Sequence, residues 1–385
     1  MTFEVLHVAP FYPPHLGGLE NHVEVLSRRQ AALGMRVTVL TSNGDGTLPD
    51  DGVHGRRVVR LPSIRTDGDS LPVGLLRGLA GTAGSHDVIH LHGHHFYSTT
   101  VGALHRRLDG TPSVMTFHGD YRKGSPLGRW IKRLRDAAQG PFILRSMDRI
   151  IALTAHDRDL LVGTGALPEN VTIIPNGVDL DAFRPLPEEE QNDFLEHSGL
   201  PEDARLVLFV GRHTEQKGLQ YLVRAVPDLV REVPRAHVFL AGAGSGMDEV
   251  RSMVRSLGVE DHVTVNGHLG SQHLVAAYTR AEVVAVPSLW EGMPLVILEA
   301  AACGTPVVAT SVSGIPEFVE EGRTGHLVPP RDPAALAEAL ASLLSSDGLA
   351  RREGRRALEK ARREFDLEVQ VRRTIETYED VMANA

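Results

Sequence analysis

Short apolar runs with the length of buried strands alternate with amphipathic stretches along this chain, and the alternation occurs twice. In the first half the runs cover Glu4–Ala9, Val37–Thr41, Arg57–Leu61, Val88–Leu91, Ser113–Phe117, Arg149–Leu153 and Val171–Ile174. In the second half they cover Leu206–Val210, His237–Ala241, Val263–Val265, Val283–Val286, Val307–Ala309 and Gly325–Val328. Such alternation is typical of parallel sheets covered by helices on both faces. The pattern therefore predicts an α/β protein with two parallel sheets.

The length of the chain and one polar segment predict where the two sheets separate. A chain of 385 residues exceeds one ordinary hydrophobic core. The segment between the two series of strands is rich in Pro, Glu and Asp, as expected of a linker. We therefore predict an N-terminal domain over residues 1–177, a linker over 178–204 and a C-terminal domain over 205–365.

Two glutamates, Glu291 and Glu299, stand around the start of one short predicted helix. Pro294 suits the first helical position and Gly304 the residue after the last, so Glu299 lies about one turn inside the helix. The unpaired amides of the first turn form an anion site. A purely solvated role is the plain alternative, but the apolar neighbours of Glu299 favour a partner for its carboxylate. The element predicts a pocket for phosphates flanked by hydroxyls, as in a sugar nucleotide.

A second candidate anion site follows the predicted strand Leu206–Val210. Its loop begins at Gly211 and carries Arg212 and Lys217, at the end of a strand where open α/β sheets bind ligands. Arg can bind a phosphate through two hydrogen bonds, and Lys adds a point charge. The nearby glycine-rich run Ala241–Gly246 lacks the spacing of a dinucleotide fingerprint. We interpret it as a tight strand-to-helix turn that lines the nucleotide pocket.

With these motifs the chain resembles the retaining nucleotide-sugar glycosyltransferases of family 4, which have the GT-B fold. In the second half the resemblance rests on Gly211-Arg212, Lys217-Gly218, Pro287-Ser288, EGMPLVILEAAACGTPVVAT from Glu291, Gly314-Ile-Pro-Glu317 and Gly325-His-Leu-Val-Pro329. In the first half it rests on Gly17-Gly18, Thr116-Phe-His118-Gly119 and Pro175-Asn-Gly-Val-Asp179. It implies two Rossmann-like domains facing each other across a deep cleft. It also implies that a C-terminal helix, in about 366–385, crosses back to complete the N-terminal domain.

The resemblance implies transfer of a sugar from a nucleoside-diphosphate sugar to an acceptor hydroxyl with retention of configuration. The sequence does not identify the base, and we place UDP-sugars ahead of GDP-sugars as donors. Departure of the diphosphate creates negative charge, which Arg212, Lys217 and the helix amides would stabilise without a metal. Glu291 would hold hydroxyls of the donor sugar, Glu299 those of the ribose, and His118 the sugar near its reacting carbon. No nucleophile is evident on the far face of the sugar, so we expect front-side attack by the acceptor hydroxyl.

The predicted site residues come from both halves of the chain. The donor-binding set comprises Gly17, Gly18, Gly211, Arg212, Lys217, Gly242, His268, Leu269, Glu291, Gly292, Met293, Pro294, Leu295, Val296 and Glu299. The catalytic set comprises His118, Glu291, Arg212 and Lys217, and the acceptor-binding set comprises His92, Tyr97, Asp120 and Lys123.

Histidines and aspartates suggest metal binding at first sight. The cluster His90-Leu-His92-Gly-His94-His95 has no carboxylate or cysteine at ligand spacing. We interpret it as a polar rim at the carboxyl end of a strand that contacts the acceptor. Three D-x-D pairs are interpreted as solvated turn residues, namely Asp67/Asp69, Asp157/Asp159 and Asp179/Asp181. We predict no metal and no cofactor.

Composition narrows the partners. A formal charge of −9 gives no support for nucleic-acid binding, and a lone cysteine, Cys303, excludes a disulfide framework. Without an apolar run of spanning length or a signal-peptide pattern, we expect a cytoplasmic protein. The basic amphipathic stretch Arg129–Arg135 leaves peripheral membrane contact open beside a soluble role. The acceptor is accordingly expected to be a small molecule or a lipid-linked one.

Two other functions remain open from the sequence. A sugar-nucleotide epimerase of the same fold would convert its substrate without an acceptor. A non-catalytic sugar-nucleotide sensor would bind the donor without turnover.

Overall fold

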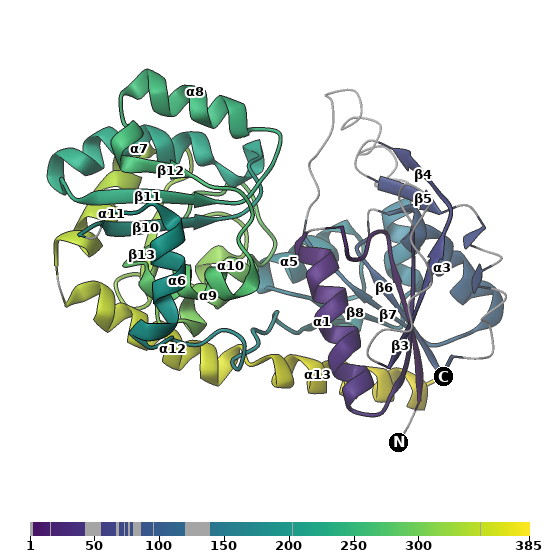
Figure 1. The fold of residues 1–385 in the computed structure, drawn as a ribbon. Helices are drawn as coiled ribbons and strands as arrows, with labels where there is room; N and C mark the ends of the chain where they lie inside the picture. The colour runs from purple at the N-terminus through teal and green to yellow at the C-terminus, as the bar shows by residue number, and fades with distance from the viewer. Residues whose placement is uncertain are drawn as a thin grey trace. The chain divides into compact units, whose positions relative to one another are not determined.

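The computed structural model describes residues 3–15, 17–42, 55–66, 69–72, 74–75, 78–79, 86–94, 96–119, 139–201, 203–346 and 348–385. The chain forms two compact units, shown in Figure 1. The first unit contains Met1–Asn176 and Val369–Ala385, and the second contains Gly177–Glu368. Four features of the sequence lie outside the described residues: Asp67, His95, the two acceptor candidates Asp120 and Lys123, and the stretch Arg129–Arg135.

The described part of the first unit contains a sheet of seven parallel strands, in the order β3-β2-β1-β6-β7-β8-β9. The strands are β1 (Glu4–Ala9), β2 (Arg36–Ser42), β3 (Arg56–Leu61), β6 (Val88–His92), β7 (Ser113–Thr116), β8 (Arg149–Ala152) and β9 (Val171–Ile173). β6 and β7 are buried over their whole length, as expected of strands covered on both faces. All strands predicted for this half are confirmed to within one residue at each end.

Helices cover both faces of the first sheet. They include α1 (Gly18–Ala32), α3 (Tyr97–Asp109), α5 (Ala155–Thr164), α13 (Leu367–Ala383) and the 3-10 turn η1 (Pro168–Asn170). Val23 of α1 and Tyr378 of α13 belong to one apolar cluster, whereas Ala103 of α3 and Leu161 of α5 belong to another. A short antiparallel pair, β4 (Ser63–Thr66) and β5 (Asp69–Pro72), was not predicted.

The second unit contains, among its described residues, a sheet of six parallel strands in the order β12-β11-β10-β13-β14-β15. These are β10 (Arg205–Val210), β11 (Ala236–Ala241), β12 (Val263–Val265), β13 (Val283–Val286), β14 (Val307–Thr310) and β15 (Gly325–Val328). The central residues of β10, β11, β13 and β14 are buried, whereas those of the outer strands β12 and β15 are partly exposed. All strands predicted for this half are confirmed to within one residue.

The helices of the second unit pack in two groups. One group comprises α7 (Leu219–Glu232), α8 (Met247–Leu257) and α11 (Pro333–Ser345). The other comprises α6 (Glu188–Ser198), α9 (Ser271–Arg280), α10 (Leu295–Ala302) and α12 (Leu349–Glu364), with single turns at η2 (Glu215–Lys217), η3 (Glu260–His262) and η4 (Ile315–Glu317). The predicted linker, 178–204, lies within this unit and contains α6, whose Phe194 is buried against Phe239.

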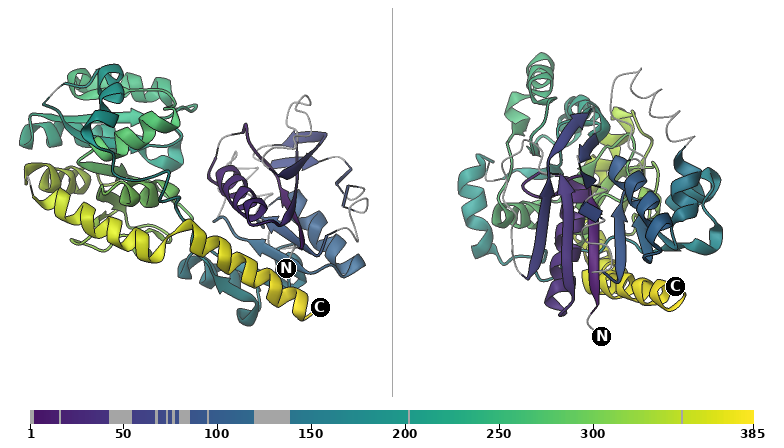
Figure 2. Two further views of the ribbon diagram at one scale, coloured as in Figure 1. Left: turned by 60° about the horizontal axis from the view of Figure 1, so that its bottom comes forward. Right: turned by 90° about the vertical axis from the view of Figure 1, so that its right-hand side faces the viewer.

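The last helix returns to the first unit, as predicted. α13 begins at Leu367, and its residues from Val369 onward belong to the first unit (Figure 2). Within that unit, Tyr378 is wholly buried and lies edge-on to the ring of Phe3. None of the helices in the described ranges is long and apolar enough to cross a membrane.

Candidate active site

The strand order of the second sheet defines a switch point between β10 and β13. β11 and β12 follow β10 on one side, and the chain then returns to place β13 on the other side. At such a reversal the connections leave the sheet in opposite directions, and open α/β sheets bind ligands there. The loop after β10 holds Arg212 and Lys217, and the loop after β13 holds Glu291. Three predicted catalytic residues therefore border one switch point.

The two loops are joined by hydrogen bonds and one ion pair. Lys217 Nζ lies 2.5 Å from Glu291 Oε1, and the Ser288 hydroxyl donates to the same oxygen at 2.8 Å. The amide of Leu289 donates to the carbonyl of Gln216 at 2.8 Å. The Lys217 and Glu291 side chains are only 17% and 8% exposed. The ion pair is therefore partly shielded from solvent, and each group is held in position by the fold itself.

Two glycines let the loops approach so closely. Gly218 has a φ of 65°, and a Cβ there would lie 1.9 Å from the carbonyl oxygen of Pro287. Gly242 has a φ of 139°, and a Cβ there would lie 2.0 Å from the carbonyl oxygen of Gly211. A side chain at either position would force backbones apart. The run Ala241–Gly246 is the strand-to-helix turn that was predicted, between β11 and α8.

The edge of the sheet continues through the loop after β12. The amide of Gly242 donates to the carbonyl of Gly267 at 2.9 Å, which places the backbone before His268 beside the glycine-rich turn. His268 is exposed and Leu269 is buried. These predicted donor residues thus lie along the edge that carries Arg212 and Lys217, and their contacts with a donor remain a prediction.

Helix α10 begins one residue later than predicted. Pro294 is its N-cap, with φ −70° and ψ 118°, so it precedes the helix rather than opening it. Gly304, with a φ of 77°, follows the helix end as predicted. The first amides of the helix, which include those of Leu295 and Val296, have no carbonyl partner within the helix. Gly292 and Met293 lie in the loop just before this terminus, and the anion site there remains a prediction.

Glu299 has a partner, as its apolar surroundings predicted. Its Oε2 accepts a hydrogen bond of 2.6 Å from the hydroxyl of Tyr278, a side chain inaccessible to solvent. Burial raises the pKa of Glu299, and the Tyr278 hydrogen bond and the charge of Lys217 oppose this rise. Glu299 is thus close enough to Lys217 to feel its charge, and its role toward a ribose remains a prediction.

Arg212 differs from Lys217 in its surroundings. Its guanidinium makes no hydrogen bond or ion pair with any residue of the described ranges. The adjacent His213 is wholly buried, and neither of its ring nitrogens has a hydrogen-bond partner in the same ranges. Sequence reasoning did not single out His213. Arg212 therefore offers an uncommitted planar donor group at the switch point, whereas Lys217 is committed to Glu291.

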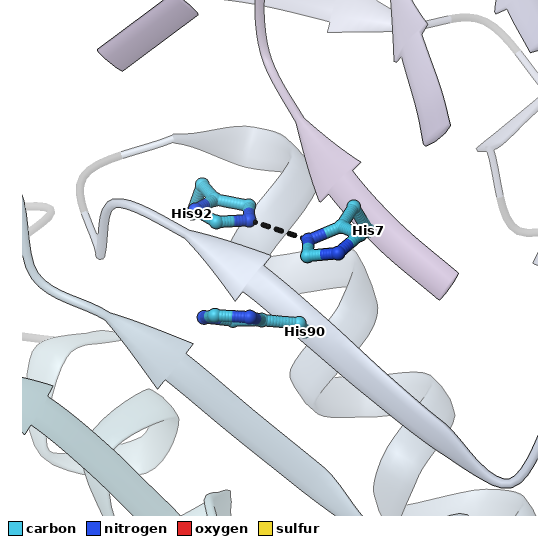
Figure 3. Close-up of side chains that lie close together, drawn as sticks. All are labelled: His7, His90 and His92. Carbon is cyan, nitrogen blue, oxygen red and sulfur yellow. Dashed lines mark hydrogen bonds between the residues drawn. The ribbon is translucent and has the colours of Figure 1, made fainter. Parts of the chain in front are cut away.

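The matching switch point of the first sheet, between β1 and β6, is filled by histidines. His7 on β1 lies 2.7 Å from Gln30 Oε1 through Nε2, and its Nδ1 lies 3.0 Å from His92 Nε2 on β6. Figure 3 shows this bond, with His90 beside it. His92 Nδ1 in turn lies 3.2 Å from Nε2 of His118, which follows β7. His118 is therefore the end of a hydrogen-bonded chain that starts at Gln30.

Burial keeps these imidazoles neutral. It lowers the pKa of His7 to about 4 and holds the pKa values of His90, His92 and His118 well below the usual range. The interpretation of this cluster as a polar rim is wrong for His90 and His92, which are inaccessible to solvent. The strand turns both inward, and His90 Nδ1 lies 2.6 Å from the hydroxyl of Tyr378 on α13. His92 lies behind His118 and is not exposed for direct contact with an acceptor.

The remaining predicted residues of the first unit lie on neighbouring elements. Gly17 is the N-cap of α1 and Gly18 its first residue, and Tyr97 is the first residue of α3. Sequence reasoning missed His7 and His22, which are both buried. The signal available for them was their position, since one lies in the first strand and the other in the helix that follows it.

The described residues contain three clusters of His, Cys, Asp or Glu with metal-compatible geometry. They are His7/His90/His92, His22/His92/His118 and Asp193/His197/His273. The D-x-D pairs at Asp157/Asp159 and Asp179/Asp181 belong to none of them.

Known proteins share both halves of this architecture. The model of Glycosyltransferase Family 4 matches residues 16–182, and that of Glycosyl transferases group 1 matches residues 190–364. D-inositol 3-phosphate glycosyltransferase 1 of Catenulispora acidiphila is 34% identical over 357 residues, which cover 85% of this chain and 82% of that protein.

Solved structures agree in fold. Sucrose-phosphate synthase from Thermosynechococcus elongatus superposes with a TM-score of 0.84 at 26% identity, over 100% of each chain. Anabaena HepE, solved in complex with UDP-glucose, superposes with a TM-score of 0.82 at 21% identity, over 98% of this chain and 100% of that one. The fold and its relatives thus define an enzyme of the GT-B glycosyltransferase class. The chain belongs to the glycosyltransferases of family 4. The epimerase alternative finds no support among these relatives.

Proposed function

We propose that this enzyme transfers a sugar from a nucleoside-diphosphate sugar to an acceptor hydroxyl, with retention of configuration and without a metal. The observation that carries the proposal is the switch point of the second sheet. There Arg212, Lys217 and the amino end of α10 supply positive charge beside the carboxylates of Glu291 and Glu299. This is the arrangement that a diphosphate between two hydroxyl-bearing sugars requires.

The proposed chemistry places the leaving group on the cations. As the bond from the anomeric carbon to the diphosphate breaks, its electrons pass to the phosphate oxygen. A cation about 4 Å from that oxygen stabilises the new charge by roughly 4 kcal/mol at an effective dielectric constant near 20. Arg212 is uncommitted and can bind the diphosphate directly, whereas Lys217 is held by Glu291 at 2.5 Å. The acceptor hydroxyl attacks from the same face, and its proton passes to the departing phosphate.

Glu291 and Glu299 are proposed to accept hydrogen bonds from the hydroxyls of the two sugars in the donor. Glu291 Oε1 is occupied by Lys217 and Ser288, so Oε2 is the oxygen we assign to the donor-sugar hydroxyls. Glu299 Oε2 is occupied by Tyr278, so Oε1 is the oxygen we assign to the ribose. His118 contributes a neutral imidazole at the switch point of the first sheet.

UDP-sugars are the proposed donors, ahead of GDP-sugars. A structure of Anabaena HepE contains UDP-glucose, which supports this order. The acceptor is proposed to be a small molecule or a lipid-linked one. Because relatives about one third identical are named D-inositol 3-phosphate glycosyltransferases, D-inositol 3-phosphate is the first acceptor to test. We further propose that the protein acts in the cytoplasm.

A donor and acceptor screen tests the function. UDP-, GDP- and ADP-sugars are incubated with and without D-inositol 3-phosphate in EDTA, and the released nucleoside diphosphate is measured. The anomeric proton coupling of the product, measured by NMR, gives the configuration. We expect acceptor-dependent release from a UDP-sugar and a retained anomeric configuration. Inversion, or formation of an epimer without acceptor, would contradict the proposal.

A further inference from the structure

Three histidines of the first unit converge on one point from three elements. His22 lies on α1, His92 is the last residue of β6, and His118 is the second residue after β7. One ring nitrogen from each lies within 4.8 Å of the other two. The rings are close, with centroids 4.7 Å apart for His22 and His118 and 5.5 Å apart for His92 and His118. The three residues are far apart in sequence, so the fold alone brings them together.

One ring nitrogen of His22, the one not bound to Asn176, has no hydrogen-bond partner in the part of the chain that the structure describes. His22 is 7% exposed, and its Nε2 makes no hydrogen bond with any residue in the described ranges. A buried polar atom without a partner is unfavourable and calls for an explanation. Within this cluster, the neighbours of His22 are the rings of His92 and His118, both of which lie edge-on to it.

Outer hydrogen bonds already fix two of the three rings in a metal-binding tautomer. His22 Nδ1 lies 2.9 Å from Asn176 Oδ1, closer than its 3.4 Å contact with Gln370 Nε2. As the donor of the shorter bond, His22 carries its proton on Nδ1 and keeps a lone pair on Nε2. His92 donates from Nε2 to His7 Nδ1, because His7 donates from Nε2 to Gln30 Oε1. His92 therefore keeps a lone pair on Nδ1, and metal-bound histidines are oriented by such outer bonds.

We propose that His22, His92 and His118 form a binding site for a divalent transition metal of the Zn²⁺ type. The ligands are His22 Nε2, His92 Nδ1 and His118 Nε2, and His118 moves its proton to Nδ1. Zn–N bonds of 2.0–2.1 Å in a tetrahedron require ligand nitrogens about 3.4 Å apart, and His92 Nδ1 and His118 Nε2 are 3.2 Å apart. His118 is partly exposed, which leaves the fourth position to water or substrate. Three neutral imidazoles suit Zn²⁺ and not Mg²⁺ or Ca²⁺.

The two other histidine clusters fit a metal less well. In His7/His90/His92, both nitrogens of His90 are already bonded, at 2.6 Å to the Tyr378 hydroxyl and at 2.7 Å to Thr116 Oγ1. A metal there would break one of these bonds inside a fully buried site, whereas the proposed site gives up only the His92–His118 bond, at its partly exposed end. Asp193/His197/His273 lies on two exposed side chains and one partly exposed side chain of the second unit, where the groups pair with one another.

A metal bound at this site is expected to affect sugar transfer. This expectation rests on the proposed role of His118 toward the donor sugar. In the metal-free protein His118 donates from Nε2 to Nδ1 of His92, so Nδ1 of His118 is the atom left for the donor sugar, as an acceptor. A bound metal takes Nε2 and shifts the proton to Nδ1, which then can no longer accept a hydrogen bond from a sugar hydroxyl. Zn²⁺ is therefore expected to inhibit transfer. This site is separate from the diphosphate site of the second unit, where the proposed chemistry uses no metal.

Titration of the metal-free protein with Co²⁺, followed by visible absorption, tests the site without any activity measurement. The wild type is expected to bind one equivalent with the intense absorption of tetrahedral Co²⁺, and Zn²⁺ is expected to displace it. His22→Phe should abolish the signal. His90→Gln and His273→Ala, which each break one of the other two clusters, should leave it unchanged. No tetrahedral signal in the wild type, or an undiminished signal in His22→Phe, would overturn the proposal.

Asn176→Ala is a second test, needed because misfolding of His22→Phe would also abolish the Co²⁺ signal. This variant leaves all three ligands in place and removes the outer hydrogen bond of His22. Loss of such an outer bond typically weakens metal affinity 10- to 100-fold, so we expect a weakened but measurable Co²⁺ signal. Unchanged affinity would contradict the assigned tautomer of His22.

Transfer assays then separate metal binding at the site from inhibition of sugar transfer by the bound metal. Co²⁺ binding without inhibition by Zn²⁺ would refute the role given to His118 Nδ1 toward the donor sugar, whereas inhibition that persists in His22→Phe would refute the link between inhibition and this site.

Discussion

The two units share one sheet plan and carry opposite chemistry at the same place in it. In each, the strand order reverses beside its first strand, between β1 and β6 in one and between β10 and β13 in the other. The first switch point holds neutral imidazoles linked by hydrogen bonds. The second holds an arginine without an ion pair or side-chain hydrogen bond in the described ranges, an ion pair and a second, partly buried carboxylate. The fold determines where on each sheet a ligand can bind. The side chains at that place determine which part of the ligand binds there.

The difference matches the two ends of the proposed reaction. A diphosphate that gains charge as it leaves needs fixed cations, which lie at the second switch point. Sugar hydroxyls need neutral donors and acceptors at fixed positions, and a chain of neutral imidazoles provides them. Variants that should affect only one of the two switch points test whether the two have different roles.

The largest effect is expected for Arg212→Ala. This change removes an uncommitted cation from the proposed leaving group, and loss of one preorganised charge stabiliser typically lowers kcat by about 10²-fold or more. Steady-state kinetics with a saturating donor measures it. Arg231→Ala is the matched control, because Arg231 lies on the exposed side of α7 and pairs with Asp228. A loss below about 3-fold for Arg212→Ala would remove this residue from the chemistry.

The two glutamates should respond differently to substitution. Glu291→Gln keeps the shape of the side chain but removes the charge that pairs with Lys217. We therefore expect kcat to fall by roughly 10-fold or more. Glu299→Ala removes contacts proposed to be equal in ground and transition states, so mainly the KM of the donor should rise. Initial-rate measurements over donor concentration separate the two. Tyr278→Phe controls for the lost hydrogen bond of Glu299. Equal small changes in both parameters would refute the assigned roles.

A smaller effect on stability is expected for Glu299→Gln. Because burial raises the pKa of Glu299 above its unfolded value, the native state releases its proton less readily than the unfolded state. The native carboxylate is thus destabilising above the folded pKa, and the penalty fades as pH falls from the folded pKa to the unfolded pKa. Thermal unfolding should show a gain for Glu299→Gln at pH 8 that vanishes near pH 4. A gain that is independent of pH would point to a packing effect instead.

No loss of activity is expected from metal removal. Treatment with EDTA should leave the transfer rate unchanged or slightly raised, since only the inhibitory metal site of the first unit would be emptied. Loss of activity that Mg²⁺ or Mn²⁺ restores would contradict the role given to Arg212 and Lys217.

The sequence predicted the elements well because each is a local pattern. The strands of both sheets followed from apolar runs and their spacing, whereas the return of the C-terminal helix followed from the resemblance to family 4. Pro294 was placed one residue too far into α10, because its fixed φ suits both an N-cap and a first helical residue. Helix α6 was missed because its acidic sequence resembles a linker, although Phe194 anchors it to the core.

The site was predicted only in part, because its contacts join residues that are distant in sequence. Lys217 and Glu291 were both singled out, but their ion pair depends on the order of strands in the sheet. The histidine chain was missed because His7 carries no motif, and His90 and His92 were expected at an exposed rim. Alternation along a strand gives the face on which a side chain lies but not the residue packed against it.

Binding of UDP tests the central claim most directly, because UDP carries the phosphates and ribose but no transferable sugar. Isothermal titration compares the wild type with Arg212→Ala and His118→Ala. Loss of a charge-assisted hydrogen bond of about 1.5–3 kcal/mol should weaken UDP binding roughly 10- to 100-fold in Arg212→Ala. UDP affinity should be unchanged in His118→Ala. If instead His118→Ala weakens UDP binding and Arg212→Ala does not, the diphosphate site does not lie at the switch point of the second unit.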